Sequence, residues 1–209
     1  MAERRLYLCT PDREDLEHFV AKCIDGGVDV VQLREKDADA RRVLERSKLL
    51  ARVCSDHGVP FILNDRPDLA LEAGADGVHV GQDDAPVSLA RRILGDEVVI
   101  GLSTHAAGEV RASESERVDY ISAGPVLETP TKPGRPGTGI SYVGLAVRES
   151  SRPVFVTGGV SPAIIDQIAA AGARHFVVVR YLTESDDPRG AARRLRDAVD
   201  RALDVGGEC

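Results

Sequence analysis

The chain has 209 residues, of which 43% are hydrophobic and 29% charged, and its formal net charge is −7. Such a chain can bury a large core without metal or disulfide support, and its length predicts one domain over residues 1–209. The acidic balance argues against nucleic acid as the main partner, because no basic tract offsets it.

Eight short apolar runs are predicted to form strands. They lie at residues 5–9, 28–33, 60–63, 77–80, 98–102, 118–123, 153–157 and 175–180. Several read as near-continuous Val, Ile and Leu, which indicates strands covered on both faces. Segments 12–25 and 39–57 between them have the apolar spacing of helices. Ser161-Pro162 and Asp187-Pro188 are typical helix starts.

Strands that alternate with helices imply right-handed parallel crossovers, and hence a doubly wound sheet or a (β/α)8 barrel. Five successive strands each end in a polar group, for which packing alone gives no reason. An open sheet would concentrate such groups near one switch point, whereas a barrel spreads them around a rim. The sequence therefore predicts a (β/α)8 TIM barrel with its active site at the C-terminal rim of the strands.

The segment Gln32-Leu33-Arg34-Glu35-Lys36 places two cations just beyond the second strand. Alternation points Gln32, Arg34 and Lys36 to one side, where Arg could grip a phosphate bidentately and Lys could act as a mobile charge. A solvated loop with an Arg–Glu pair is the alternative.

Asn64 and Asp65 close the third strand, and Asp84 follows the fourth. Two carboxylates that converge from neighbouring strands could hold one Mg²⁺, which prefers oxygen ligands and keeps open positions for water or substrate phosphate. The amide of Asn64 could donate to a phosphate oxygen. Aspartates that serve only turns and helix caps are the alternative.

Ser103 ends the fifth strand, where it could contact phosphate or merely cap the next helix. His105 follows it and could act as an acid or base, although a surface or capping role is the simpler interpretation. In the segment Thr157-Gly158-Gly159, the glycines would let a backbone N–H approach a phosphate, or would serve only a tight turn.

The segment 124–139 is too long and too rich in Pro and Gly for a simple connector. Such loops often act as lids over a ligand, and Thr129, Thr131 and Lys132 form the expected working tip. A surface loop with incidental charge is the alternative.

The four cysteines, at positions 9, 23, 54 and 209, form no CxxC pair and no zinc-like cluster. They are expected to be reduced thiols, with Cys9 and Cys23 buried. No apolar signal segment and no membrane-length stretch is found, so a cytoplasmic protein without a membrane partner is expected. The sequence leaves a homo-oligomer open.

Taken together, these motifs resemble those of the thiamine-phosphate synthase family. The matching segments follow the family's order along nearly the whole chain. They are LYLCT at 6–10, QLREK at 32–36, ND at 64–65, GADGVHVGQDD at 74–84, GLSTH at 101–105, GPVLETPTKPGRPGTG at 124–139, TGG at 157–159 and VVVR at 177–180. The combination of GADGVHVGQ-D with a TPTK loop is highly specific.

The resemblance implies a TIM barrel and a role for each matched position. The pyrimidine substrate, chiefly its diphosphate, would be contacted by Gln32, Arg34, Lys36, Asn64, Ser103 and Lys132. Of these, Arg34, Lys36, Ser103 and Lys132 would carry the catalytic charge handling. Asp65 and Asp84 would hold Mg²⁺, and Thr129, Thr131 and Gly159 would contact the thiazole phosphate. Two positions depart from the family pattern: Leu127 replaces a frequent aromatic residue, and Arg180, placed at the end of the last strand, replaces a small residue.

The implied reaction is a transfer. It condenses 4-amino-2-methyl-5-hydroxymethylpyrimidine diphosphate with 4-methyl-5-(2-phosphoethyl)thiazole, or its 2-carboxy form, to give thiamine phosphate and pyrophosphate through a pyrimidine carbocation. A thiazole tautomerase of the same superfamily is one alternative, with His105 as its proton-transfer group. A phosphate-ligand-binding barrel without activity is another, since a fold alone does not fix function.

Overall fold

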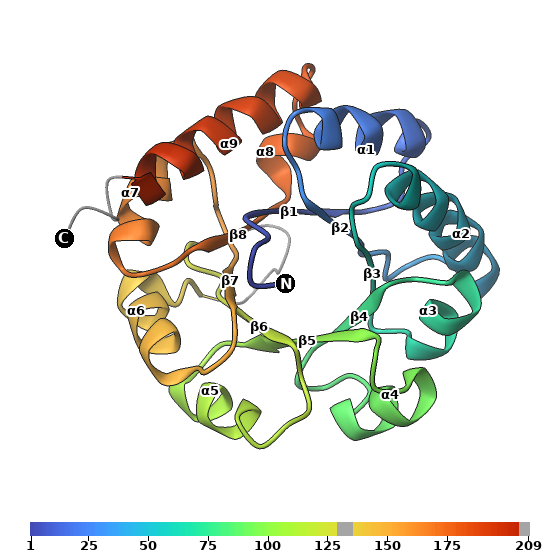
Figure 1. The fold of residues 1–209 in the computed structure, drawn as a ribbon, viewed down its shortest axis with the longest axis horizontal. Coiled ribbons are helices and arrows are strands. Elements are labelled where there is room, and N and C mark those ends of the chain that lie inside the picture. Colours follow the sequence, from blue (N-terminus) through green and yellow to red (C-terminus); the bar gives the residue numbers. More distant parts are fainter. Residues whose placement is uncertain (129–135, 205–209) are drawn as a thin grey trace.

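A computed structural model describes residues 1–128 and 136–204. Its parallel strands pair in chain order and close into a barrel, with β8 beside β1, as Figure 1 shows. The strands are β1 (Leu6–Thr10), β2 (Val30–Leu33), β3 (Phe61–Asn64), β4 (Gly77–Val80), β5 (Val99–Thr104), β6 (Tyr120–Ala123), β7 (Val154–Val156) and β8 (His175–Val178). The predicted (β/α)8 TIM barrel is confirmed.

Helices surround the barrel and cover the outer face of the strands (Figure 1). They are α1 (Leu16–Asp25), α2 (Ala40–Asp56), α3 (Pro67–Ala73), α4 (Val87–Leu94), α5 (Ala107–Ser113), α6 (Gly139–Glu149), α7 (Pro162–Ala170), α8 (Arg180–Thr183) and α9 (Pro188–Asp204). The long helix α9 packs against both α1 and α7 and so closes the ring of helices between them. Within the described part of the chain, no helix combines the length and apolarity needed to cross a membrane.

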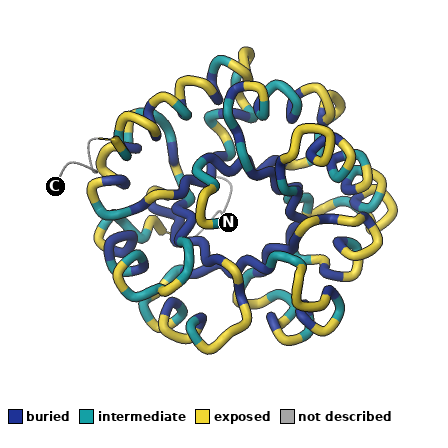
Figure 2. Tube along the Cα trace, in the orientation of Figure 1, coloured by how far each residue is buried: buried dark blue, intermediate teal, exposed yellow. Residues whose placement is uncertain are grey.

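Strand alternation divides the apolar side chains between two cores. Leu6 and Leu8 of β1 pack in the large core between the sheet and the helices, whereas Tyr7 and Cys9 point into the barrel. The strands are consequently buried along almost their whole length, which gives the dark blue inner ring of Figure 2. This burial on both faces explains why the strands read as continuous apolar runs.

Helix boundaries follow local chemistry. The side chain of Asp39 caps α2 by accepting a hydrogen bond from the Arg42 N–H at 2.9 Å, and that of Asp187 accepts from the Gly190 N–H at 3.0 Å beside the start of α9. Gly58 follows α2 with φ of 64°, the left-handed conformation that suits a glycine. Ser161 occupies the N-cap position of α7 as expected, but its side chain makes no capping bond.

Aspartates tie neighbouring strands together at the N-terminal end of the barrel. Asp29, Asp76 and Asp119 each directly precede an even-numbered strand. Each side chain accepts hydrogen bonds from backbone N–H groups at the start of the preceding odd-numbered strand. The donors are Arg5 and Leu6, Phe61, and Ile100. A carboxylate satisfies strand-end N–H groups that the ladder leaves without partners.

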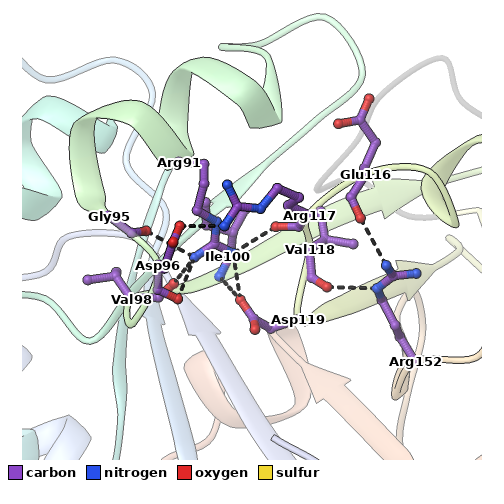
Figure 3. A network of polar contacts seen from close by, with 10 residues as sticks. All are labelled: Arg91, Gly95, Asp96, Val98, Ile100, Glu116, Arg117, Val118, Asp119 and Arg152. Atoms are coloured by element: carbon purple, nitrogen blue, oxygen red, sulfur yellow. Dashed lines mark hydrogen bonds and ion pairs between the residues drawn. The ribbon is translucent and has the colours of Figure 1, made fainter.

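The buried Arg91 of α4 extends this arrangement beneath β5 and β6. Its guanidinium donates to the carbonyls of Gly95, Asp96, Val98 and Arg117 at 2.7 to 3.1 Å, and to the Asp119 carboxylate at 3.0 Å (Figure 3). Only 7% of the Arg91 side chain is exposed. The network lies at the N-terminal end of the barrel, the end that serves stability rather than catalysis in this fold.

One expectation about local structure was wrong, and one alternative is excluded. The eighth strand ends at Val178, so Arg180 does not end a strand but begins the short helix α8. Ser103 lies within β5, and α5 has Ala106 at its N-cap position, so Ser103 does not cap that helix. In both cases the end of the strand is set by backbone hydrogen bonds to the neighbouring strand. A short apolar run in the sequence does not show where these bonds stop.

Candidate active site

Three connected cavities lie over the C-terminal ends of the strands. The first, here called the acidic cavity, has a volume of about 270 Å³ and is lined by residues that include Arg34, Lys36, Asp65 and Asp84. The second, the inner cavity, has about 70 Å³ and reaches down to Tyr7 and Tyr120 inside the barrel. The third, the glycine cavity, has about 320 Å³ and lies over Gly158, Gly159 and Arg180.

Shared wall residues connect these cavities. Arg34, Asn64 and Ser103 border both the acidic and the inner cavity. Thr157, Val177 and Val179 border both the inner and the glycine cavity. The structure therefore brings together Gln32, Arg34, Lys36, Asn64, Asp65, Asp84 and Ser103, with Gly159 at the far end of the same rim.

The cations that follow β2 face the acidic cavity. Nζ of Lys36 lies 2.9 Å from Oδ2 of Asp65, and Arg34 borders the acidic and inner cavities. Glu35 instead turns back, and its carboxylate accepts backbone N–H bonds from Asp12 and Asp37. Glu35 thus orders the loop and leaves the two cations directed at the cavity, contrary to the alternative of an Arg–Glu pair.

Asp65 holds a backbone conformation that is rare outside glycine, with φ of 63°. Its N–H donates to the carbonyl of His79 on β4 at 2.8 Å, so the end of β3 stays bonded while the side chain turns into the cavity. Aspartate tolerates the left-handed region better than most residues, and such strain concentrates at functional sites.

Asp84 faces Asp65 from the loop after β4. Its Oδ2 accepts the N–H of Gly81 at 2.9 Å, and a Cβ at position 81 would come within 2.7 Å of that oxygen, so a side chain there would displace the carboxylate. Burial raises the pKa of Asp65, and the hydrogen bond and charge of Asp84 raise it further, against the opposing effect of Lys36. Burial also acts to raise the pKa of Asp84, but its hydrogen bonds to Asp65 and the Gly81 N–H and the charge of Lys36 outweigh it, so the pKa lies below the usual value.

The two carboxyls therefore titrate as a pair, with Asp65 the one that binds a proton more readily. Two oxygen donors held in contact against their mutual repulsion fit a divalent cation, which would relieve that repulsion. Within residues 1–128 and 136–204, no group of three or more His, Cys, Asp and Glu side chains gathers around a common point. An ion held by Asp65 and Asp84 would thus keep most of its positions for water or a substrate phosphate.

Two residues that sequence reasoning missed, His79 and Tyr120, form the floor of the inner cavity. Nε2 of His79 lies 2.9 Å from Oγ of Ser103, and Nδ1 lies 3.0 Å from Oη of Tyr120. Both side chains lie at strand positions, on β4 and β6, that face the barrel interior. A polar residue at an inward-facing strand position is the sequence signal that could have revealed them.

His105 lies on the wall of the acidic cavity rather than at its centre. Its Nδ1 contacts the carbonyl oxygen of Gly124, and its backbone N–H donates to Oε2 of Glu109 at 2.6 Å. These contacts join the ends of β5 and β6, which is a structural use of the ring.

The glycine cavity contains a cation of its own. Gly158 and Gly159 have φ of 95° and 75°, and a Cβ on Gly158 would lie 2.4 Å from Pro125, so the turn can pack against the neighbouring loop only with glycine. Arg180 forms a bidentate pair with Glu184 at 2.7 and 3.1 Å, and both side chains are more than half exposed. Leu127 covers Gly159 at the rim.

Three of the residues predicted for the lid, Thr129, Thr131 and Lys132, lie outside the described residues. The thiols are better defined. Cys9, Cys23 and Cys54 are buried thiols outside any disulfide among the described residues, and burial raises the pKa of both Cys23 and Cys54 to about 12. Those two side chains are therefore packing groups rather than nucleophiles.

The fold and the rim define a TIM-barrel protein built to handle anionic ligands at the C-terminal ends of its strands. Residues 6–182 match the family model described as thiamine monophosphate synthase. A thiamine-phosphate synthase of Thermobifida fusca is 48% identical and covers 92% of this chain and 90% of its own length. One of Saccharopolyspora erythraea is 47% identical, with 94% and 93% covered.

A solved structure supports the same assignment. Thiamine phosphate pyrophosphorylase from Pyrococcus furiosus superposes with a TM-score of 0.87 at 28% identity, covering 95% of this chain and 96% of the other. The chain belongs to the thiamine monophosphate synthase family.

Proposed function

We propose that this protein is a thiamine-phosphate synthase, a transferase that joins a pyrimidine diphosphate to a thiazole phosphate. The observation that carries the proposal is the connection of the acidic cavity to the glycine cavity through the inner cavity. Such a row of cavities would accommodate two anionic groups with a flat ring between them. Membership of the family supports the same reaction.

The diphosphate would lie in the acidic cavity, within reach of Arg34 and Lys36. The amide of Asn64 and the hydroxyl of Ser103 line the boundary to the inner cavity, where Gln32 and the pyrimidine ring would meet. The thiazole phosphate would lie over Gly159, with Arg180 as a further cation. Thr129, Thr131 and Lys132 are proposed to complete both sites from the 124–139 loop, as family membership suggests.

The residues of this chain would act by stabilising charge. The bond between the pyrimidine methylene carbon and the diphosphate oxygen breaks with its electron pair passing to the oxygen, and the thiazole nitrogen then attacks the cationic carbon. Arg34 and Lys36 would hold the charge that develops on the leaving diphosphate. Mg²⁺, which Asp65 and Asp84 would hold, supplies Lewis-acid neutralisation of the same charge when bound. No covalent intermediate on the enzyme is required.

A tautomerase activity is less well supported. It needs no diphosphate grip, yet two cations and a carboxylate pair meet in one cavity, and His105 is engaged in structural contacts. The similar relatives argue against a purely ligand-binding barrel, because they are named as synthases.

Turnover with both substrates and Mg²⁺ tests the proposal. Pyrophosphate and thiamine phosphate should appear in equal amounts. Arg34→Met should lower turnover by about 100-fold, on the scale of losing one preorganised donor, whereas Arg66→Met, an exposed arginine paired with Asp68, should keep it. Isomerisation of a carboxylated thiazole without pyrophosphate release would indicate the tautomerase, and binding without turnover would indicate the non-catalytic barrel.

We also propose that the protein works in the cytoplasm on small-molecule substrates. The buried, reduced thiols of Cys9, Cys23 and Cys54 suit a reducing compartment. The Arg180 end of the site would determine whether the protein prefers a carboxylated or an uncarboxylated thiazole.

A further inference from the structure

A continuous line of hydrogen bonds runs through the barrel interior and ends at the acidic cavity. It joins side chains of β1, β2, β4, β5 and β6, and each step is 2.9 or 3.0 Å long. In order, its members are Cys9, Gln32, Tyr7, Tyr120, His79 and Ser103. All of them are buried, and all of them line the inner cavity.

The chemistry of the first members gives the line a direction. The thiol of Cys9 donates to Oε1 of Gln32, which leaves the Gln32 amide nitrogen facing Oη of Tyr7. An amide nitrogen only donates, so the Tyr7 oxygen accepts this bond. Either tyrosine can donate in the 3.0 Å bond between Tyr7 and Tyr120, and the direction that continues the line sends the Tyr7 proton to the oxygen of Tyr120.

One tautomer of His79 continues the line in this direction. When Tyr120 accepts from Tyr7, its own proton can go to Nδ1 of His79, 3.0 Å away. A neutral imidazole that accepts at Nδ1 carries its proton on Nε2, and this N–H donates to Oγ of Ser103 at 2.9 Å. An imidazolium would donate from both nitrogens and leave the Tyr120 proton without an acceptor.

The packing shows that this arrangement is built in. The rings of His79 and Tyr120 stack with centroids 5.5 Å apart and planes 28° apart. A Cβ at Gly101 would lie 2.1 Å from Cζ of Tyr120 and 2.5 Å from Nδ1 of His79, so the stack exists only because β5 has a glycine there. Phe155 packs edge-on against Tyr120 and Tyr7, with ring centroids 5.0 and 5.5 Å away, respectively.

We infer that Tyr120 and His79 are positioning residues that orient the Ser103 hydroxyl as a hydrogen-bond donor toward the substrate. Because Ser103 accepts from Nε2 of His79, its own proton is available to a group at the boundary of the acidic and inner cavities. This inference rests on the proposed function for its ligand, the diphosphate oxygen that leaves the pyrimidine. Ser103 transfers no proton in this role; its hydrogen bond strengthens as the breaking carbon–oxygen bond leaves its electron pair on that oxygen.

Imidazole nitrogen NMR of the free enzyme tests the direction of the line without any substrate. His79, identified by the signals lost in His79→Gln, should be neutral, with a proton-bearing Nε2 and an accepting Nδ1. Tyr120→Phe removes the donor to Nδ1 and should abolish this single tautomer. A proton on Nδ1 of His79 in the wild-type protein, or an imidazolium, would overturn the inference.

Turnover tests the consequence for Ser103. Tyr120→Phe should lower kcat about 10-fold with little change in KM, the scale expected for one weakened hydrogen bond in the transition state. The matched control is Tyr142→Phe, which removes a hydroxyl bonded at 2.8 Å to Thr104 on the same strand but outside the line. Full kcat in Tyr120→Phe, or an equal loss in both variants, would contradict the inference. A wild-type protein with the expected tautomer but no turnover would instead refute the proposed function.

Discussion

Lys36 and Asp65 form an ion pair across the ends of β2 and β3, with Nζ 2.9 Å from Oδ2. The pair places an ammonium group on a carboxylate that is also the best candidate ligand for Mg²⁺. Binding of the metal and a diphosphate together would resolve this competition, since Lys36 can turn from Asp65 to a phosphate oxygen while the metal takes its place. The ion pair thus couples the two ligands of the acidic cavity.

Replacing Lys36 separates these two effects. Lys36→Met should strengthen Mg²⁺ binding to the free enzyme several-fold, because it removes a positive charge beside the metal position. The same change should raise KM for the pyrimidine diphosphate and lower kcat. Calorimetric titration with Mg²⁺ and steady-state kinetics measure the two arms, and weaker Mg²⁺ binding would argue against a shared position.

The carboxylate pair can be tested against a neighbour in the same cavity. Asp65→Asn and Asp84→Asn should each raise the Mg²⁺ concentration needed for half-maximal activity by at least about 10-fold, the loss typical of removing a residue that supports a metal ligand. Asp83→Asn, which alters an exposed carboxylate beside Asp84, should change it little. A Mg²⁺ titration in which Asp83 mattered and Asp84 did not would reassign the ligand.

The raised pKa of Asp65 gives metal binding a pH dependence. Burial and the neighbouring Asp84 raise the pKa of this carboxyl above its usual value of 3.8 in the folded protein. Protonated Asp65 therefore contributes to the free energy of unfolding in full below pH 3.8, and this contribution is lost as the pH rises through the raised pKa. Mg²⁺ binds the deprotonated pair, so the rise in Tm on adding Mg²⁺ should be larger at about pH 8 than at about pH 5. Asp65→Asn should lose this difference, and an equal rise at both pH values in the wild type would contradict a raised pKa of Asp65.

The Arg180–Glu184 pair predicts an effect confined to the thiazole side. Exposed pairs contribute little to stability, so Arg180 can exchange Glu184 for a phosphate at low cost. Arg180→Ala should raise KM for the thiazole phosphate about 10-fold and leave KM for the pyrimidine diphosphate unchanged. Steady-state kinetics with each substrate varied in turn measure this, with Arg66→Ala as the exposed control; equal changes for both substrates would place Arg180 elsewhere.

The Arg91 network predicts a loss of stability without a loss of function. Arg91→Met would leave four backbone carbonyls and Asp119 without their donor, and should lower the free energy of unfolding by about 3 kcal/mol. Arg117→Met, which removes an exposed pair with Asp96, should change it by less than about 0.5 kcal/mol. Denaturant unfolding followed by circular dichroism gives both values, and KM for either substrate should stay the same.

The sequence predicted the barrel because its strands are buried on both faces and its helices have clear periodicity. It also placed Arg34, Asp65 and Asp84 at one rim, since the carboxyl ends of parallel strands must meet there. It did not reveal the line from Cys9 to Ser103, because its members are far apart in the chain and only barrel closure brings Tyr7 beside Tyr120. The end of β8 was misjudged at Arg180 because an apolar run does not show where ladder pairing stops.

A crystal structure with thiamine phosphate, pyrophosphate and Mg²⁺ tests the central claim most directly. Pyrophosphate and metal should lie in the acidic cavity between Arg34 and the Asp65–Asp84 pair, with the product phosphate over Gly159 near Arg180. Pyrophosphate bound over Gly159, or a metal bound away from both aspartates, would contradict the account.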